Sequence, residues 1–133
     1  MAQTAMKHSG QREAIRAYLL STKSHPTAEM VYESVREAYP KISLGTVYRN
    51  LTLLVELGEA KKVASVDGQD RFDADMSPHY HLICRQCNAV EDLMLPVEEG
   101  LLREAKAGYA GEIESCEVLF YGSCEQCKKG NRA

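Results

Sequence analysis

The apolar positions of residues 1–60 recur at the spacing of helices. We predict a first helix over residues 10–21, capped by Ser9, and a second helix that begins after a cap at Thr27. A third helix is expected from a cap at Ser43 to a stop at Gly58. The inward faces of the three are expected to hold Ala14, Ile15, Tyr18 and Leu19, then Met30, Val31, Val35 and Ala38, then Val47, Leu51 and Leu54. Three short helices in this order predict a helix-turn-helix.

Two strand-like runs come directly after the third helix. Residues 60–66 and 69–72 are joined by Asp67-Gly68, a dipeptide typical of a tight hairpin turn. A hairpin that follows a helix-turn-helix is a wing. We expect Lys61, Lys62 and Arg71 to bring charge from the wing to a phosphate backbone.

The rest of the chain alternates in the manner of short strands around one helix. We predict strands over residues 79–84, 89–95 and 112–122, and a helix over 97–107. The predicted fold class is α+β. An N-terminal winged helix-turn-helix domain that binds DNA covers residues 1–74, residues 75–78 form a linker, and a small C-terminal α/β domain covers 79–133.

Composition narrows the class of protein. No apolar run approaches the roughly 20 residues that a spanning helix needs, and the N-terminus lacks the apolar core of a signal peptide. We therefore expect a cytoplasmic protein without a membrane partner. The net charge of −3 is not the strongly basic balance typical of nucleic-acid binding, so DNA contact has to come from a local patch, from a dimer, or from charge that a metal adds.

Four of the five cysteines form two C-x2-C pairs, and in a reducing compartment cysteines of this kind are metal ligands or redox thiols. Zinc takes four thiolates in a tetrahedron, and each pair supplies two. We predict a closed, structural zinc site and keep two independent redox dithiols as the alternative. The fifth cysteine, Cys116, is expected to be a small buried residue on a strand. The predicted zinc ligands are Cys84, Cys87, Cys124 and Cys127.

A second set of ligands offers only nitrogen and oxygen. His79 and His81 lie two residues apart, so both imidazoles point to one face of a strand. His25 lies between the first two helices, Asp73 at the end of the wing, and Asp92 on the neighbouring strand. A metal held by all five would clamp the helical half to the sheet half. Three imidazoles and two carboxylates suit Fe2+, Mn2+, Zn2+ or Co2+, and the sequence leaves the choice open.

The third helix carries polar residues beside its apolar face. Tyr48 can belong to the core, whereas Arg49 and Asn50 are expected off the apolar stripe and available to base edges. Arginine suits guanine and asparagine suits adenine. A solvated helix face is the alternative interpretation.

Taken together, these residues form five ordered motifs that resemble the ferric uptake regulator family. The likeness extends from about residue 9 to residue 127. The motifs are His25-Pro-Thr-Ala, Gly45-Thr-Val-Tyr-Arg-Asn-Leu51, Arg71-Phe-Asp73, His79-Tyr-His-Leu-Ile-Cys84 and Tyr121-Gly-Ser-Cys-Glu-Gln-Cys127.

The resemblance implies a dimeric, metal-dependent repressor of palindromic operators, with dimerisation through the C-terminal domain. By that likeness the four cysteines hold structural Zn2+, and the His/Asp set is a regulatory site for Fe2+ or Mn2+. Residues expected at the DNA are Lys7, Thr46, Tyr48, Arg49 and Asn50. The sequence departs from the family's pattern at its start, where most members have an additional helix before residue 9.

Aspartate at positions 73 and 92 is most similar to the peroxide-responsive branch of the family. We therefore predict sensing of peroxide by oxidation of a ligand histidine, with no other small-molecule substrate. An iron- or zinc-responsive uptake regulator is the alternative. An enzyme is not expected, because the carboxylates are better explained as ligands and no H-E-x-x-H motif is present. A sensor that acts through its cysteine pairs is a further alternative.

Overall fold

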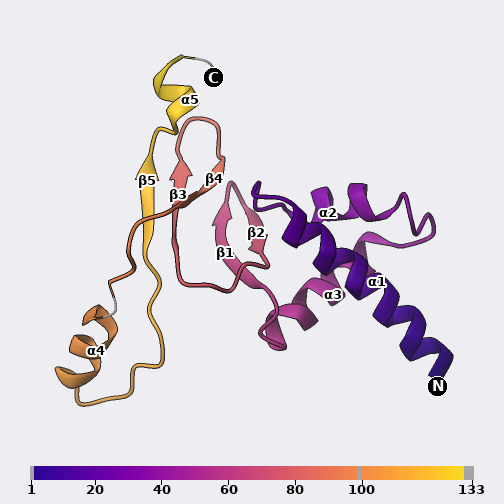
Figure 1. The fold of residues 1–133 in the computed structure, drawn as a ribbon, viewed down its shortest axis with the longest axis horizontal. Coiled ribbons are helices and arrows are strands. Elements are labelled where there is room, and N and C mark those ends of the chain that lie inside the picture. The colour runs from indigo at the N-terminus through magenta and orange to yellow at the C-terminus, as the bar shows by residue number, and fades with distance from the viewer. Residues whose placement is uncertain (1, 99, 131–133) are drawn as a thin grey trace. The chain divides into compact units, whose positions relative to one another are not determined.

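The chain forms two compact units in the computed structural model, residues 1–77 and residues 78–133. The structure describes the backbone of residues 2–98 and 100–130, and the side chains of 10–98 and 100–130. Figure 1 traces the elements of each unit along the chain. The contact boundary falls between Ser77 and Pro78, and the predicted linker over 75–78 stays a prediction.

Three helices dominate the N-terminal unit: α1 (Ala2–Ser21), α2 (Ala28–Val35) and α3 (Leu44–Glu56). The prediction that Ser9 caps the first helix is wrong, because α1 begins at Ala2 and continues through this position. Residues 2–7 are mostly good helix formers, so the helix propagates beyond the expected start. The residues between Ala2 and the predicted start at residue 10 therefore form further turns of α1.

The predicted caps of α2 and α3 are confirmed. The Thr27 hydroxyl accepts a hydrogen bond from the Met30 N–H at 3.2 Å, and the Ser43 hydroxyl accepts one from the Thr46 N–H at 3.1 Å. Gly58 adopts φ +74° directly after the last turn of α3, a conformation that side chains with a Cβ rarely adopt. Side-chain oxygens at the start and a glycine at the stop therefore fix where these helices begin and end.

The core of the N-terminal unit contains the predicted face of α3 and most of the predicted faces of α1 and α2. Met30 and Ala38 are corrections, because both are exposed. The buried stripe of α2 follows Ala28, Val31 and Val35, which turns Met30 outward; the helix ends at Val35, so Ala38 lies beyond it. The core comprises Ile15, Leu19, Ala28, Val31, Val35, Ile42, Val47, Leu51, Leu54, Ala60, Phe72 and Ala74.

The wing is a two-stranded hairpin of β1 (Lys61–Val66) and β2 (Gln69–Asp73). Val66 pairs with Gln69, and the two residues between them, Asp67 and Gly68, have φ +53° and +78°. Positive φ at both turn positions is what the right-handed twist of a two-residue hairpin requires. The predicted Asp-Gly turn is confirmed.

The C-terminal unit has a three-stranded sheet of order β4-β3-β5. The central strand β3 (Tyr80–Cys84) pairs antiparallel with β4 (Val90–Leu93) and parallel with β5 (Leu119–Gly122), which Figure 1 draws at its side. The strand expected over residues 112–122 is shorter than predicted. Cys116 consequently lies outside it and is exposed, so the prediction of a buried strand residue is wrong.

Two helices complete the C-terminal unit, α4 (Gly100–Ala107) and α5 (Glu125–Lys128). Every residue of α4 is exposed or half-buried. This unit also contributes large apolar side chains with substantial exposure: Met94 75%, Leu95 51%, Leu101 48%, Tyr109 60%, Phe120 40% and Tyr121 53%. Of the helices that the structure describes, none has the length and apolar character needed to cross a membrane.

Candidate metal centres and nucleic-acid interface

The four paired cysteines converge at one end of the C-terminal sheet. Cys84 ends β3, Cys87 follows in the turn, Cys124 is the residue before α5, and Cys127 lies within α5. Because β5 runs parallel to β3, the chain returns to the same end of the sheet, with Cys84 opposite Gly122. The parallel pairing therefore brings together two motifs that are far apart in sequence.

The sulfur atoms have the separation that a tetrahedral ion requires. The four Sγ atoms lie within 4.8 Å of one another, and those of Cys87 and Cys124 are 3.8 Å apart. A tetrahedron with Zn–S bonds of about 2.3 Å has sulfur–sulfur edges of about 3.8 Å. All five cysteines of the chain are free thiols. The cluster thus fits a single four-thiolate ion better than two separate dithiols.

The surroundings of the cluster distribute charge unevenly among the thiols. Backbone N–H groups of Cys124 and Cys87 point at the Cys84 sulfur, at 3.3 and 3.5 Å, and lower the pKa of Cys84 to about 6. Burial and the neighbouring thiols raise the pKa of Cys127 to about 12. Without a bound cation, deprotonation of a second or third thiol in the cluster is opposed by the negative charge already present. A divalent ion would compensate for that charge, and for this reason such sites couple metal binding to proton release and folding.

A buried histidine–aspartate pair lies in the N-terminal unit. His25 Nε2 is 3.3 Å from Asp73 Oδ2, and both side chains are nearly inaccessible to solvent. His25 has φ +53°, a strained conformation for a residue other than glycine. Its loop is fixed to β2 because the Phe72 N–H donates to the Pro26 carbonyl at 3.0 Å.

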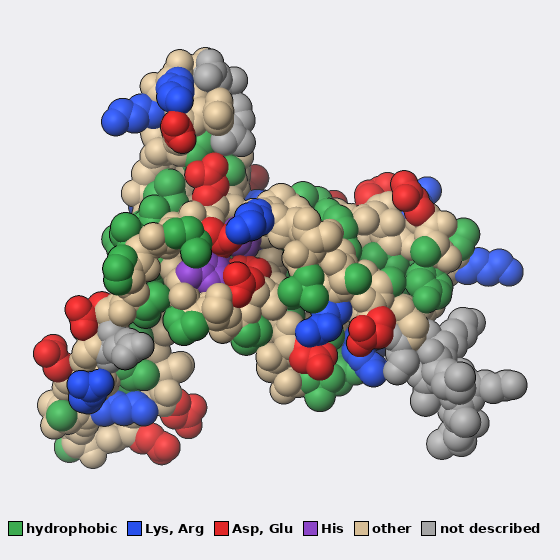
Figure 2. All heavy atoms as spheres, viewed as in Figure 1, with side chains coloured by type: hydrophobic (Ala, Val, Ile, Leu, Met, Phe, Trp, Pro, Cys, Tyr) green, Lys and Arg blue, Asp and Glu red, His purple; other side chains and the backbone are tan. Residues whose placement is uncertain are grey.

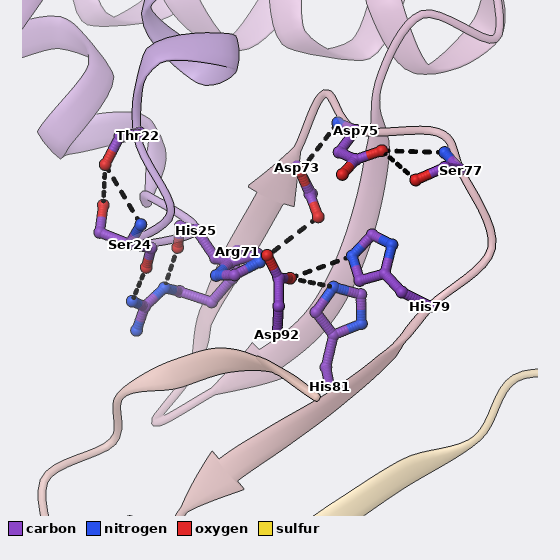
Figure 3. A network of polar contacts seen from close by, with 10 residues as sticks. All are labelled: Thr22, Ser24, His25, Arg71, Asp73, Asp75, Ser77, His79, His81 and Asp92. Carbon is purple, nitrogen blue, oxygen red and sulfur yellow. Dashed lines mark hydrogen bonds and ion pairs between the residues drawn. The ribbon is translucent and has the colours of Figure 1, made fainter. Parts of the chain in front are cut away.

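Arg71 holds this loop from the other side, which corrects its predicted contact with a phosphate backbone. Its Nε donates to the carbonyl of His25, and its Nη2 donates to the carbonyl of Ser24 at 2.8 Å (Figure 3). A guanidinium that bridges two successive carbonyls restrains the strained turn. The sequence signal was the motif Arg71-Phe-Asp73, in which the arginine stands two residues before a ligand.

Three potential ligands meet on the C-terminal sheet. Asp92 lies opposite His81 in the β3–β4 register, and its Oδ1 is 3.5 Å from His81 Nε2 and 3.0 Å from His79 Nε2 (Figure 3). The two imidazole centroids are 4.5 Å apart. The expectation that H-x-H spacing turns both rings to one face is confirmed. The side chains of His79, His81 and Asp92 are 2%, 6% and 12% exposed, so this set is shielded from solvent.

The predicted DNA residues of α3 divide between its two sides. Tyr48 is 48% exposed, Arg49 is exposed, and the Arg49 Nη2 donates to the Thr46 hydroxyl at 2.9 Å. Asn50 is only 8% exposed, and its Nδ2 donates to the Thr46 carbonyl at 3.0 Å, so the expectation that it is available to base edges is wrong. The helical period places Asn50 three residues from Val47, on the buried side. The side chain of Lys7 lies outside the described residues.

A helix-turn-helix with a wing, followed by an α/β unit that carries a four-cysteine cluster, defines a metal-binding transcription regulator. The comparisons with known proteins agree. Residues 3–121 match the model of the ferric uptake regulator family. The peroxide-responsive repressor PerR of Staphylococcus aureus is 32% identical over 128 residues, which are 96% of this chain and 86% of that protein.

Two solved structures show the same fold. The peroxide stress regulator of Campylobacter jejuni aligns with a TM-score of 0.78 and 26% identity over 95% of each chain. The Helicobacter pylori ferric uptake regulator Fur aligns with a TM-score of 0.74 and 22% identity over 96% of this chain and 89% of that one. The chain belongs to the ferric uptake regulator family. The predicted family, fold class and metal-dependent repressor function are confirmed.

Proposed function

We propose that this protein is a cytoplasmic, dimeric repressor that binds palindromic operator DNA when metal is bound, and releases it when peroxide oxidises a ligand histidine. The observation that carries the proposal is the donor chemistry of the two histidine–aspartate sets, buried and without a thiolate. The similarity to PerR of Staphylococcus aureus, a peroxide-responsive repressor, supports the same reading.

The two kinds of donor set suit two different ions. Four thiolates select Zn2+, which has no redox chemistry and is held structurally by closed tetrahedral sites. Imidazole and carboxylate donors suit Fe2+ or Mn2+. We assign Zn2+ to the cysteine cluster and Fe2+ or Mn2+ to the histidine–aspartate residues. Each unit therefore has a function of its own in the proposal, and the regulatory ion links them.

The regulatory site is proposed to take ligands from both units. His25 and Asp73 come from the N-terminal unit, and His79, His81 and Asp92 come from the C-terminal unit. An ion shared by the two sets would select one angle between the units. In a dimer that angle sets the distance between the two α3 helices, which has to match the half-site spacing of a palindrome.

Neutralisation of the carboxylates would assist binding to a polyanion. On the face drawn in Figure 2, Lys and Arg side chains are interspersed with Asp and Glu side chains. The chain carries a net charge of −3, so each cation that it binds makes approach to DNA more favourable.

Dimerisation is proposed through the C-terminal unit, whose large apolar side chains cover little of one another. Leu95, Leu101 and Tyr109 are each about half exposed or more. Exposed apolar side chains gathered in one small unit are typical of an interface between subunits. A second copy of the chain, related by a two-fold axis, would present two α3 helices to a palindrome.

The proposed peroxide reaction converts one ligand imidazole into 2-oxo-imidazole. Net, one oxygen atom of H2O2 is added to the carbon between the two ring nitrogens, and one water molecule leaves; histidine loses two electrons and peroxide gains them. A bound ferrous ion supplies the one-electron chemistry that activates peroxide. His25, His79 and His81 would hold this ion through their ring nitrogens, and the low exposure of their side chains would limit the access of bulk solvent to the reacting carbon.

Mass spectrometry after peroxide treatment of the Fe2+-loaded protein tests this function. Two tryptic peptides, residues 24–36 and 72–85, contain the three histidines that are predicted ligands. We expect one added oxygen on His25, His79 or His81, together with loss of binding to operator DNA selected from a random library. Met30 and Met76 lie in the same peptides and are exposed, so fragment ions have to assign the oxygen to histidine.

The Mn2+-loaded protein is the control, because it binds the same ligands and supplies no comparable one-electron chemistry. It should keep its histidines unmodified and its DNA bound. Unmodified histidines in the Fe2+ protein, with DNA affinity that follows only the metal concentration, would replace peroxide sensing by iron or zinc sensing. Zinc loss and dimer dissociation without histidine oxidation would assign the sensing to the cysteines.

A further inference from the structure

The segment between β2 and β3, residues 74–79, forms neither helix nor strand. It leaves the N-terminal unit at Ala74, which is 7% exposed and belongs to the apolar core, and residues 75–78 are exposed. Exposed connections of this kind are usually mobile, because water competes for their hydrogen bonds and few apolar contacts hold them. The part of this segment that belongs to the N-terminal unit nevertheless has a defined set of hydrogen bonds.

Asp75 and Ser77 form a turn at the end of the N-terminal unit. The Asp75 Oδ1 accepts a hydrogen bond from the Ser77 N–H at 3.0 Å and a second one from the Ser77 hydroxyl (Figure 3). An aspartate that accepts from the backbone two residues later is a common turn former. The next residue, Pro78, restricts the backbone of Ser77 to extended conformations. Residues 75–77 are therefore held in one conformation although they are exposed.

A further hydrogen bond connects this turn to a predicted metal ligand. The Asp75 N–H donates to Asp73 Oδ1 at 2.8 Å, while Asp73 Oδ2 lies 3.3 Å from His25 Nε2. The Asp73 carboxylate thus has one oxygen on the linker and the other on the ligand set. Because the two oxygens belong to one rigid planar group, a rotation of the carboxylate that breaks one contact disturbs the other. The conformation of the linker and the orientation of the ligand are therefore coupled.

We propose that the hydrogen bonds from Ser77 to Asp75 and from Asp75 to Asp73 form a linker lock, which holds the chain in the direction that the metal-loaded protein uses as it leaves the N-terminal unit. The inference deepens the proposed function, on which it rests, by assigning Asp75 as a positioning residue outside the ligand set. A linker that is already ordered reduces the entropy lost when two ligand sets bind one ion. The lock therefore favours the conformer that binds metal and DNA.

A lock of this kind has a specific thermodynamic signature. Its loss lowers the population of the binding-competent conformer, and the apparent dissociation constant of every ligand that needs this conformer rises by the same factor. Mn2+ affinity and the DNA affinity of the protein without regulatory metal should therefore fall together. Saturating Mn2+ restores the competent conformer, so the DNA affinity of the Mn2+-loaded protein should stay unchanged. A residue that contacts DNA, or one that only stabilises the fold, would not give this combination.

A comparison of Asp75→Ala with Asp75→Asn tests the lock in the full-length, zinc-loaded protein. Both substitutions remove the same charge, but asparagine keeps a side-chain oxygen that supports the turn. Chelator competition measures the Mn2+ affinity, and fluorescence anisotropy measures binding to operator DNA selected from a random library, without and with saturating Mn2+. Asp75→Ala should bind Mn2+, and DNA without Mn2+, about fivefold more weakly than Asp75→Asn, the effect of one lost hydrogen bond. At saturating Mn2+ the two variants should bind DNA equally.

A second comparison removes one hydroxyl from the linker or from the wing. Ser77→Ala deletes a hydroxyl that donates to Asp75, and the matched control Ser65→Ala deletes one that donates to Asp70. Only Ser77→Ala should weaken Mn2+ binding. Amide hydrogen exchange measured by NMR needs neither regulatory metal nor DNA: the Ser77 N–H should exchange slowly in the wild-type protein and faster in Asp75→Ala. Thermal unfolding shows that each variant is folded, as expected for substitutions of exposed residues.

The outcomes separate the linker lock from the proposed function. Equal Mn2+ affinities of Asp75→Ala and Asp75→Asn would overturn the lock, and so would a wild-type Ser77 N–H that exchanges as fast as in an unstructured peptide. A loss of DNA affinity in Asp75→Ala that persists at saturating Mn2+ would also overturn it, because Asp75 would then act at the DNA. Absence of metal-dependent DNA binding in the wild-type protein would overturn the repressor function, while the Mn2+ affinities and the amide exchange would still decide on the lock.

Discussion

The two units of this chain are stabilised in different ways. The N-terminal unit buries a continuous apolar core that includes Ile15, Val31, Leu51 and Leu54 at 2% exposure or less. In the C-terminal unit, the buried cluster around α5 consists instead of Cys84, Cys124 and Cys127. The apolar side chains of α4 are exposed or half-buried. The first arrangement is typical of a unit that folds by hydrophobic burial, and we expect the stability of the second unit to depend on a bound metal ion.

The different stabilisation of the two units follows from the small size of the C-terminal unit and from its proposed part in metal sensing. A unit of 56 residues buries too little apolar surface to be stable by that means alone, so small domains of this size commonly use metals or oligomerisation. A low stability also suits a sensor. A ligand that binds only the folded form of a unit stabilises that form, so in a unit of low stability the ligand determines how much of the protein is folded. In the proposed function, the unit that contacts DNA has an apolar core of its own, and the C-terminal unit is completed by metal ions and a second copy of the chain.

Removal of the structural ion is expected to have the largest effect on this contrast. The substitution Cys84→Ser leaves three thiolates, and structural zinc contributes an apparent ~10 kcal/mol or more to small domains. We expect the C-terminal unit to unfold and the N-terminal unit to remain folded. Hydrogen-exchange mass spectrometry should show loss of protection over residues 78–130 and retained protection over the core helices α2 and α3.

The control for this substitution is Cys116→Ser, since Cys116 is exposed and lies outside the cluster. It should retain one zinc per chain and wild-type protection. Equal loss of protection in both units of Cys84→Ser would show that the N-terminal unit does not fold independently, and would contradict the contrast.

A substitution that creates a cavity in the apolar core should destabilise the N-terminal unit and leave the zinc site of the C-terminal unit intact. Leu51 is 0% exposed, and Leu51→Ala is expected to lower the free energy of unfolding of the N-terminal unit by about 2–5 kcal/mol. Leu57→Ala is the matched control, because Leu57 is 56% exposed and the same truncation there should cost less than about 0.5 kcal/mol. Denaturant unfolding measures both. Zinc content should be unchanged in each variant, and loss of zinc from Leu51→Ala would count against separate cores.

Much of the N-terminal unit could be predicted from local signals. Thr27, Ser43 and the Asp67-Gly68 turn act through their own hydrogen bonds and backbone angles, so short stretches of sequence contain the information. The start of α1 was missed because a favourable N-cap at Ser9 does not stop a helix whose preceding residues also favour it.

The errors in the candidate sites have another origin. Asn50 and Arg71 were assigned to DNA by residue type, and both make contacts that depend on packing: Asn50 turns to a carbonyl of its own helix, and Arg71 bonds to a loop 46 positions earlier in the chain. The metal-ligand motifs were easier to predict, because the spacing within H-x-H and within each C-x2-C pair itself brings the two side chains together. Cys116 was misplaced because the extent of β5 depends on pairing with β3.

The exposed apolar side chains of the C-terminal unit should matter for association rather than for folding. Leu101→Glu is expected to weaken the dimer by about 3 kcal/mol, because a symmetric interface loses two buried leucines and gains two charges. Leu20→Glu, on a leucine of α1 that is 54% exposed, is the matched control. Analytical ultracentrifugation over a range of concentrations measures the change. A wild-type dimer in Leu101→Glu would place the interface elsewhere.

The smallest effect is expected where one residue positions another. Arg71→Lys removes the guanidinium that bridges the Ser24 and His25 carbonyls, so His25 is held less firmly in its strained conformation. Loss of such a supporting contact typically lowers metal affinity by about 10–100-fold. Competition with a Mn2+ chelator measures the affinity, and Arg36→Lys, an exposed arginine of the same unit, is the control. An unchanged affinity, with an unchanged melting temperature, would show that Arg71 does not act through the loop.

The account depends most on one regulatory ion being shared by ligands from both units. A double-mutant cycle on Mn2+ affinity tests this directly, in zinc-loaded protein with His25→Ala, His81→Ala and both together. The account predicts that each single substitution weakens the same Mn2+ site and the metal-dependent gain in DNA affinity, and that the two effects are strongly non-additive because they act on one ion. Two Mn2+ sites that respond separately, or a Mn2+ affinity that is unchanged by His25→Ala, would contradict it.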